Sequence, residues 1–153
     1  MSQVIENTEL TSSPANAEIT SSTNDNPIRV LHIITRMIVG GAQENTLLSV
    51  EGLDAMPEYY VDFISGIDTG REGELLTRAR ETTNLIIVPE LGRAINPFSD
   101  VVTFWKLYRL IKKGKYHIVH THSSKAGVLG RITAWLAGTP FLPFGEPGRG
   151  CFR

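Results

Sequence analysis

Short apolar runs rich in β-branched residues alternate with segments of helical periodicity from Pro27 onward, and this alternation limits the possible folds more than any other feature. A strand that is followed by a helix and then by another strand usually returns in the same direction, through a right-handed crossover. The pattern therefore predicts an α/β fold, a Rossmann-like doubly wound parallel sheet. The carboxyl ends of its strands would share one edge, where such sheets bind ligands.

Four strands and four helices are expected. The strands fall at residues 28–34, 59–64, 85–88 and 117–120, and the helices at 42–50, 72–81, 97–114 and from Ser123 or Ser124 to Gly138. Helical periodicity also predicts which side chains are buried. On the third helix these are Val101, Phe104, Trp105, Tyr108 and Ile111, and on the fourth they are Val128, Leu129, Ile132, Ala134, Trp135 and Leu136.

Composition divides the chain into three parts. Residues 1–26 are rich in Ser, Thr, Asn and Glu without a sustained apolar period, which is typical of a disordered tail. Residues 27–140 are expected to form one domain, and residues 141–153 an aberrant or truncated C-terminal tail. The tail carries no secretory signal, and no later stretch approaches the ~20 apolar residues of a membrane span.

Net charge and cysteine content bear on the expected partners and on the expected location of the protein. A formal net charge of -1 gives no global electrostatic reason to expect nucleic acid as a partner. The single Cys151 cannot form an internal disulfide, so a reducing compartment is the default and a cytoplasmic location is expected.

The first candidate site follows the strand at 28–34. Gly40 and Gly41 have no Cβ to keep a ligand away, and Gln43 stands in the first turn of the next helix, where free N–H groups favour phosphate or sugar hydroxyls. A tight strand-to-helix turn without a ligand explains the two glycines equally well. A dinucleotide site is disfavoured, because the glycines are adjacent and Asp62 lies inside the strand at 59–64 instead of at its end.

The second candidate site follows the strand at 117–120, where His120, His122, Ser123, Ser124 and Lys125 gather within one turn of a helix start. Lys125 would meet an anionic group, and His122 would contact a sugar hydroxyl or transfer a proton near neutral pH. An N-cap role is sufficient to explain Ser123, and His120 is expected to be a buried structural residue. The two histidines share one strand face, but the sequence shows no third ligand, so no metal is expected.

Two segments carry a resemblance to a known family. The run Val39-Gly40-Gly41-Ala42-Gln43 resembles the glycine-rich loop after the first strand of family 4 glycosyltransferases, which have the GT-B fold. The segment HTHSSKAGVLGR, from His120 to Arg131, is similar to one found in many bacterial members, often those that build exopolysaccharide or lipopolysaccharide. The resemblance covers residues 28–140 and corresponds to the N-terminal, acceptor-side half of such an enzyme.

The resemblance implies a retaining transfer of a hexose from a nucleotide sugar to a glycan or lipid-linked acceptor in cell-surface polysaccharide synthesis. Gly40 and Gly41 would face the donor phosphates and the acceptor. Gln43 is also expected to bind substrate or phosphate. His122, Ser123 and Lys125 would line the acceptor side. Family members usually need no metal or other cofactor, and the nucleotide sugar is a co-substrate.

The sequence after Pro140 departs from the family pattern. A β-branched strand and a histidine-glycine loop are expected there, but residues 141–153 are rich in proline and glycine, which argues against a central strand. No catalytic residue is therefore expected within this chain. The polypeptide alone is expected to be inactive, because donor positioning and transition-state stabilisation would come from the other half. A frameshifted or truncated gene is the favoured explanation, and a natural half-enzyme stays open.

A second class of function is peripheral membrane contact. Lys106, Arg109, Lys112 and Lys113 cluster on the helix at 97–114, and such a basic face can meet anionic lipid headgroups. A solvated surface opposite a core-facing stripe explains the same residues. The alternative function is therefore a non-catalytic α/β binding module, or a peripheral membrane-associated subunit that pairs with a separate donor domain.

Overall fold

The computed structural model describes residues 26–67, 73–92 and 94–142. The elements follow in the order β1 (Ile28–Ile34), α1 (Gly41–Asp54), β2 (Tyr59–Ser65), α2 (Gly73–Thr82), β3 (Asn84–Ile87), α3 (Pro97–Gly114), β4 (Ile118–Thr121) and α4 (Ser124–Ala137). The four strands form one sheet in the order β3-β2-β1-β4, and every pairing is parallel. The predicted α/β fold is confirmed. The predicted N-terminal tail lies almost wholly outside the described residues.

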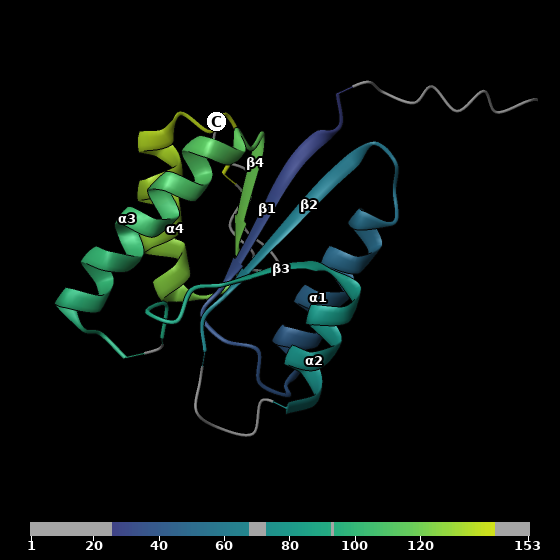
Figure 1. Ribbon diagram of the computed structural model, residues 1–153, viewed down its shortest axis with the longest axis horizontal. Coiled ribbons are helices and arrows are strands. Elements are labelled where there is room, and N and C mark those ends of the chain that lie inside the picture. Colours follow the sequence, from purple (N-terminus) through teal and green to yellow (C-terminus); the bar gives the residue numbers. More distant parts are fainter. Residues whose placement is uncertain (1–25, 68–72, 93, 143–153) are drawn as a thin grey trace, which may run out of the picture.

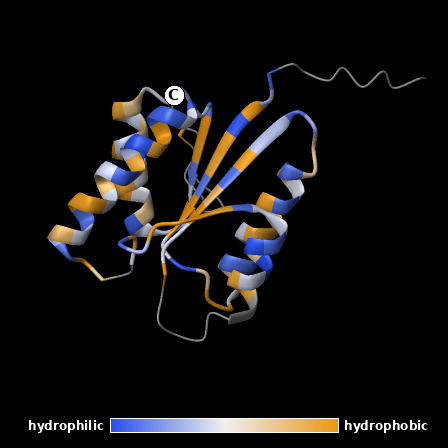
Figure 2. Cartoon of the chain, viewed as in Figure 1, coloured by the Kyte–Doolittle hydropathy of each residue, from blue (hydrophilic) through white to orange (hydrophobic). Residues whose placement is uncertain are grey.

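The sheet is covered on both faces, as a doubly wound fold requires. Helices α1 and α2 lie on one face and α3 and α4 on the other (Figure 1). Hydrophobic colours concentrate on the strands, whereas the helices carry hydrophilic stretches (Figure 2). Successive strand side chains point to opposite faces. On β1, Leu31 and Ile33 accordingly pack in the core that includes α3 and α4, and Val30 and Ile34 in the core that includes α1 and α2.

Asp62 lies inside β2, as the sequence predicted, and its buried carboxylate holds a structural polar cluster. Its two oxygens accept hydrogen bonds from the Asn84 side chain and from the Tyr116 hydroxyl, and the Arg29 guanidinium lies 3.9 Å from Oδ2. Burial, and then the bond to Asp62, raises the pKa of the Tyr116 hydroxyl above its ordinary value. Arg29 belongs to β1 and Asn84 to β3, and Tyr116 lies two residues before β4. The cluster therefore connects the amino-terminal parts of these strands to β2.

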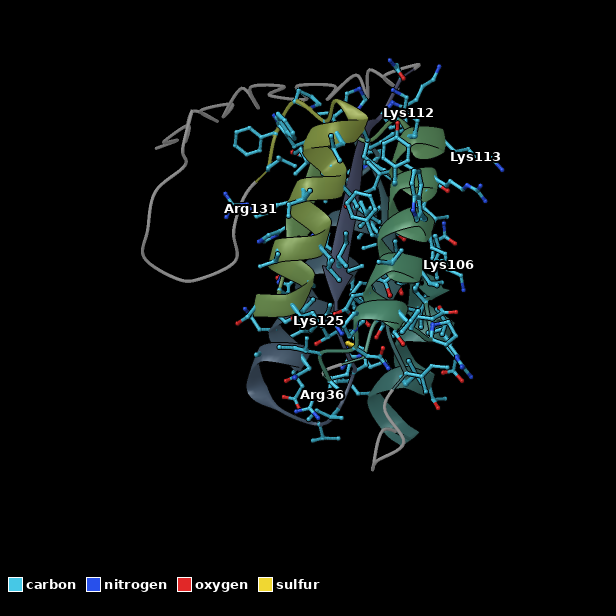
Figure 3. All side chains as sticks on the ribbon, turned by 90° about the vertical axis from the view of Figure 1, so that its left-hand side faces the viewer. Arg36, Lys106, Lys112, Lys113, Lys125 and Arg131 are labelled. Carbon is cyan, nitrogen blue, oxygen red and sulfur yellow. The ribbon has the colours of Figure 1, made fainter. Side chains whose placement is uncertain are left out.

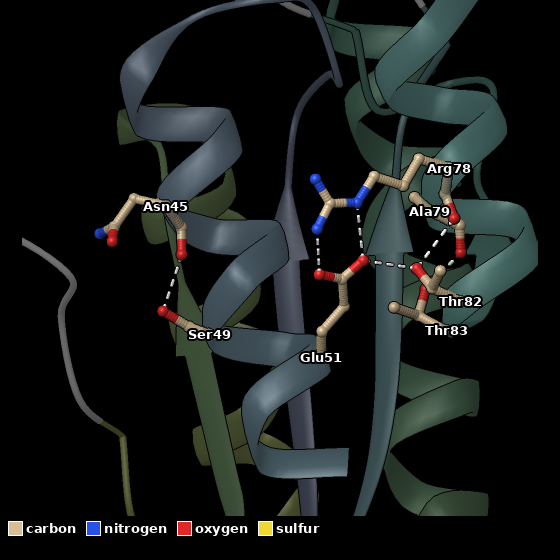
Figure 4. A network of polar contacts seen from close by, with 7 residues as sticks. All are labelled: Asn45, Ser49, Glu51, Arg78, Ala79, Thr82 and Thr83. Carbon is tan, nitrogen blue, oxygen red and sulfur yellow. Dashed lines mark hydrogen bonds and ion pairs between the residues drawn. The ribbon is translucent and has the colours of Figure 1, made fainter. Parts of the chain in front are cut away.

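A second polar network joins α1 to α2 (Figure 4). Arg78 donates from Nε and Nη2 to the two oxygens of Glu51, at 3.0 and 2.5 Å, and the Thr82 hydroxyl donates to Oε1 at 2.7 Å. The bonds from Arg78 lower the pKa of Glu51. The pair is exposed to solvent, so its contribution to the free energy of unfolding is small, but its bidentate geometry fixes how the two helices lie against each other.

The buried face of α3 differs from the prediction. Thr103, Leu107 and Ile111 are buried, whereas Val101 and Trp105 are more than half exposed. Apolar residues occur on both stripes of this helix, so periodicity alone could not choose between them. The buried residues of α3 recur every four positions. They lie on the side of α3 that packs against α4 and the core of the sheet.

The buried face of α4 was predicted correctly at Ala134 and wrongly at most of its larger residues. Its buried positions are Ala126, Gly127, Gly130, Thr133 and Ala134. The larger residues Val128, Ile132, Trp135 and Leu136 lie exposed instead. Small side chains let the helix approach the sheet closely. A Cβ on Gly130 would lie 2.9 Å from Thr121 Cγ2 and 3.2 Å from Ile33 Cδ1, both on neighbouring strands.

The chain continues to pair beyond α4. After Gly138 closes the helix in the left-handed conformation, Phe141 forms a parallel bridge with Ile118 of β4. Its N–H donates to the His117 carbonyl, and its carbonyl accepts from the Val119 N–H. This bridge is isolated and lies outside the four strands of the sheet, so it does not contradict the expectation that no central strand follows Pro140. The rest of that segment, residues 143–153, lies outside the described residues.

The close contact at Gly130 predicts that a side chain there destabilises the fold. We expect Gly130→Val to lower the free energy of unfolding by about 1–3 kcal/mol, because Thr121 is a stiff, buried strand residue that cannot move away. Gly52→Ala on α1 is the matched control, since a Cβ there meets nothing within 4 Å. It should stabilise by about 0.5–1 kcal/mol through helix propensity. Urea titrations measure the free energy of unfolding of both variants. Equal changes at the two sites would contradict the close contact of Gly130 with Thr121.

Candidate functional site

A cleft of about 620 Å³ opens at the carboxyl edge of the sheet. One wall is formed by Thr35 and Arg36, which directly follow β1, and by Gln43 in the first turn of α1. The other wall belongs to the first two turns of α4, from Ser123 to Leu129, and to the start of α3. Both predicted strand-to-helix junctions therefore contribute to one cavity, as the parallel sheet requires.

The structure brings together some of the predicted site residues and separates others. Gln43, Ser123 and Lys125 line the cleft, whereas Gly40, Gly41 and His122 are not among the lining residues described. A Cβ on Gly41 would meet nothing within 4 Å, so the backbone there is open to an approaching group. Gly40 has an extended backbone, and a Cβ there would meet only the flexible Gln43 amide, at 2.9 Å. The glycines thus lie beside the cleft and leave space next to it.

Lys125 is a mostly buried cation at the entrance of α4. Its ammonium donates to the Ala94 carbonyl and lies 2.6 Å from Asp100 Oδ1 on α3. The side chain therefore has a structural role, because it joins the start of α4 to the start of α3. It also places a positive charge on the cleft wall, on the same side of the molecule as Arg36 (Figure 3).

Ser123 does not act as the expected helix cap. It occupies the N-cap position of α4 with extended backbone angles, but its side chain makes no capping hydrogen bond. Among the described residues its Oγ finds no partner, although the atom is buried. Buried hydroxyls usually have hydrogen-bond partners. Ser123 lines the cleft, and the donor and acceptor capacity of its hydroxyl is unused among the described residues, which suits a ligand oxygen.

His122 belongs to a cluster of three histidines instead of the cleft wall. His32 on β1 is in register with His120 on β4, and His122 follows two residues later on the same face. His32 Nδ1 lies 2.8 Å from His122 Nε2, and the three ring centroids are 4.2 to 5.1 Å apart. His32 is fully buried, whereas His120 is only half-buried instead of the buried residue predicted.

Burial determines the protonation of this histidine cluster. It lowers the pKa of His32 and that of His122 to about 3, with a further contribution from neighbouring histidines, and it also lowers the pKa of His120. The three rings are therefore neutral at pH 7. A lowered pKa makes His122 a weak proton acceptor near neutral pH, and its predicted role in proton transfer stays a prediction.

The cleft combines groups of different chemistry. Arg36 and Lys125 supply positive charge, Asp100 adds one carboxylate that is paired with Lys125, and Ser123 and Ser124 supply hydroxyls. The N-terminus of α4 adds the favourable dipole for an anion. Ile95, Val128 and Leu129 form an apolar part of the lining. Such a site suits a ligand that joins an anionic or hydroxyl-rich group to an apolar one.

Sequence reasoning missed five residues in this region. Thr35 and Arg36 could have been found, because they directly follow a predicted strand at its carboxyl end. Ile95 and Asp100 could not, since only the packing of α3 against α4 brings them to the cleft. His32 looked like one more residue of an apolar strand, and only its register with β4 reveals the cluster.

Comparison of the sequence with known proteins shows homology to a glycosyltransferase. Over 113 residues the chain is 35% identical to the UDP-Gal:alpha-D-GlcNAc-diphosphoundecaprenol alpha-1,3-galactosyltransferase of Escherichia coli. The match takes in 74% of this chain and 28% of that enzyme, so the chain spans less than a third of the length of its relative. No family model matches the sequence.

Solved structures share the fold. A glycosyltransferase from Rickettsia africae ESF-5 matches with a TM-score of 0.58 and 21% identity, over 78% of this chain and 29% of that one. MurG from Acinetobacter baumannii matches with the same TM-score and identity, over 81% of this chain and 37% of that one. The fold is therefore shared with GT-B glycosyltransferases, and the homology supports the resemblance to part of such an enzyme.

The contact between Lys125 and Asp100 predicts a measurable coupling. A double-mutant cycle with Lys125→Gln and Asp100→Asn should give a coupling energy of about 1 kcal/mol, because both side chains are largely shielded from water. The matched control is the more exposed pair Lys106 and Glu90, which should couple by less than about 0.5 kcal/mol. Denaturant unfolding measures both cycles. No coupling at Lys125 would show that its position is not held by Asp100.

Proposed function

We propose that this chain supplies the acceptor-binding side of a glycosyltransferase. The reaction would transfer a hexose from a nucleotide sugar, with retention of configuration, to a lipid-linked acceptor in cell-surface polysaccharide synthesis. Membership of family 4 is part of the proposal and rests on the two motifs in the sequence. The nucleotide sugar would act as co-substrate, and no other cofactor is proposed for this reaction.

The observation that carries the proposal is the homology to an enzyme whose name specifies a diphosphoundecaprenol-linked acceptor. It covers 74% of this chain, and the structure of this chain has a cleft at the carboxyl edge of its sheet. It also favours a transferase over a binding module without transferase ancestry. Donor binding and turnover belong to the proposal for the whole enzyme, because this chain spans only part of its relative.

The cleft offers a specific way to bind such an acceptor. The diphosphate would lie between Arg36, Lys125 and the N-terminus of α4, where positive charge and backbone N–H groups are combined. The buried Ser123 hydroxyl would bond a phosphate or sugar oxygen and gain the partner it lacks among the described residues. The start of the lipid chain would contact the apolar lining near Val128 and Leu129.

Binding of a water-soluble acceptor analogue tests this placement. The probe is α-GlcNAc diphosphate on a short prenyl chain, titrated into the purified chain by calorimetry. We expect Lys125→Gln to weaken binding by about 10- to 100-fold, the loss of one hydrogen bond from a charged donor. Asp100→Asn breaks the same ion pair but keeps the ammonium, so it should bind at least as tightly as the unchanged chain.

The matched charge control is Lys112→Gln, at the far end of α3 (Figure 3). It should leave affinity within about twofold, since the diphosphate does not approach that end. Equal losses in Lys125→Gln and Lys112→Gln would mean non-specific attraction, and no binding to the unchanged chain would refute the acceptor site.

Membrane contact is the second part of the proposal, and the exposure of Trp105 favours it. The ring is 56% exposed on α3, in the neighbourhood of the exposed Phe98 and Val101. Lys112 and Lys113 point outward from the same helix (Figure 3). Aromatic and apolar groups beside lysines suit the headgroup region of an anionic membrane. No helix among the described residues is long and apolar enough to cross a membrane.

Sedimentation with vesicles that contain phosphatidylglycerol tests the membrane contact. The chain should pellet with the vesicles at low salt and much less at high salt, because headgroup attraction is screened. Trp105→Ser and the double change Lys112→Gln with Lys113→Gln should each reduce the bound fraction several-fold. Arg80→Gln on α2, across the sheet, should not. The proposal that α3 faces the membrane would be contradicted if the chain pelleted to the same extent at low and high salt. It would also be contradicted if Arg80→Gln reduced the bound fraction as much as the changes on α3.

A further inference from the structure

We propose that His32, His120 and His122 form a binding site for a divalent transition-metal ion of the zinc type, at the carboxyl ends of β1 and β4. Each imidazole would supply one nitrogen, and a water molecule or a ligand oxygen would take the fourth position. Imidazole nitrogen is a preferred ligand of Zn²⁺ and of its neighbours Co²⁺ and Ni²⁺. The inference concerns these three side chains and stands independently of the proposed transferase function.

The geometry is close to what such an ion requires. One candidate ligand atom from each histidine lies within 4.8 Å of those of the other two. Zn–N distances of about 2.0–2.1 Å in a tetrahedron put the nitrogens roughly 3.3 Å apart. Candidate nitrogens that are up to 4.8 Å apart must therefore approach one another by as much as about 1.5 Å as the ion enters.

The hydrogen bonding of His32 is incomplete. Its ring is only 1% exposed, and in the part of the chain that the structure describes its Nε2 atom has no hydrogen-bond partner. Buried polar atoms without a partner are uncommon in native proteins, and an ion or a water is a usual explanation. A shared ion also gives three adjacent imidazoles a common partner, which their one mutual hydrogen bond does not.

Access and position determine what the ion would do. His120 and His122 are half-buried, so an ion can reach the cluster from their side, while His32 forms its floor. The bound ion would link β1 to β4 next to the cleft, because His122 precedes Ser123 directly. With only three protein ligands, it would keep an exchangeable position open toward solvent.

Metal binding to the chain without added tags tests this site. The chain carries Cys151→Ser, so that the thiol cannot bind metal, and is freed of metal with a chelator before titration with Zn²⁺. We expect one ion per chain with a Kd on the order of micromolar, and a rise in Tm when Zn²⁺ is in excess. Co²⁺ in its place should give the visible absorption of a tetrahedral site.

Variants separate the cluster from other metal-binding groups. His120→Gln and His122→Gln, each a partly exposed position, should weaken Zn²⁺ binding by at least tenfold and abolish the Co²⁺ absorption. His117→Gln removes the remaining histidine, whose Nδ1 accepts from the Arg29 N–H, and should change neither. Circular dichroism confirms that each variant is folded. The proposed site would be overturned if the chain without histidine substitutions bound no Zn²⁺, or if Zn²⁺ binding survived both His120→Gln and His122→Gln. An equal loss of Zn²⁺ binding in His117→Gln would also overturn it.

Discussion

The parallel pairing of β1 with a neighbour on each side is the constraint on which the rest of the structure depends. Register with β2 and with β4 aligns the ends of the strands, so that Ile33 pairs with Ile64 on one side and Thr121 on the other. Residues 90 positions apart in the chain thereby come within hydrogen-bond distance. The cleft lies where this pairing ends, and the histidine cluster takes His32 and His120 from the paired strands and His122 from the residue that follows β4.

Close packing of α4 is the second requirement. Ala126, Gly127 and Gly130 have little or no side chain, and this lets the helix lie directly against β4 and β1. Larger residues turn outward as a result, which leaves Val128 on the rim of the cleft and Trp135 exposed beyond it. The start of α4 is then held to α3 through Lys125, so the residues that are proposed to bind the acceptor are also fixed by the fold.

The number of strands and their parallel direction could be predicted from the sequence, because β-branched runs alternate with helical segments of ordinary length. The buried faces of α3 and α4 could not. On α4, glycine and alanine are buried because the helix needs a close approach, whereas a hydropathy pattern assigns burial to the largest apolar side chains. Ser123 shows the same limit at the site, since its sequence position is that of a cap while its hydroxyl is left for another partner.

The central claim is that the cleft between the β1–α1 loop and the start of α4 binds a diphosphate. A map of backbone amide shifts in the isotope-labelled chain, titrated with the soluble acceptor analogue, tests it most directly. The account predicts saturable shifts concentrated at Thr35, Arg36 and Ser123 to Lys125, with α2 unchanged. Shifts centred on another face of the molecule, or none at saturating concentrations of the analogue, would contradict it.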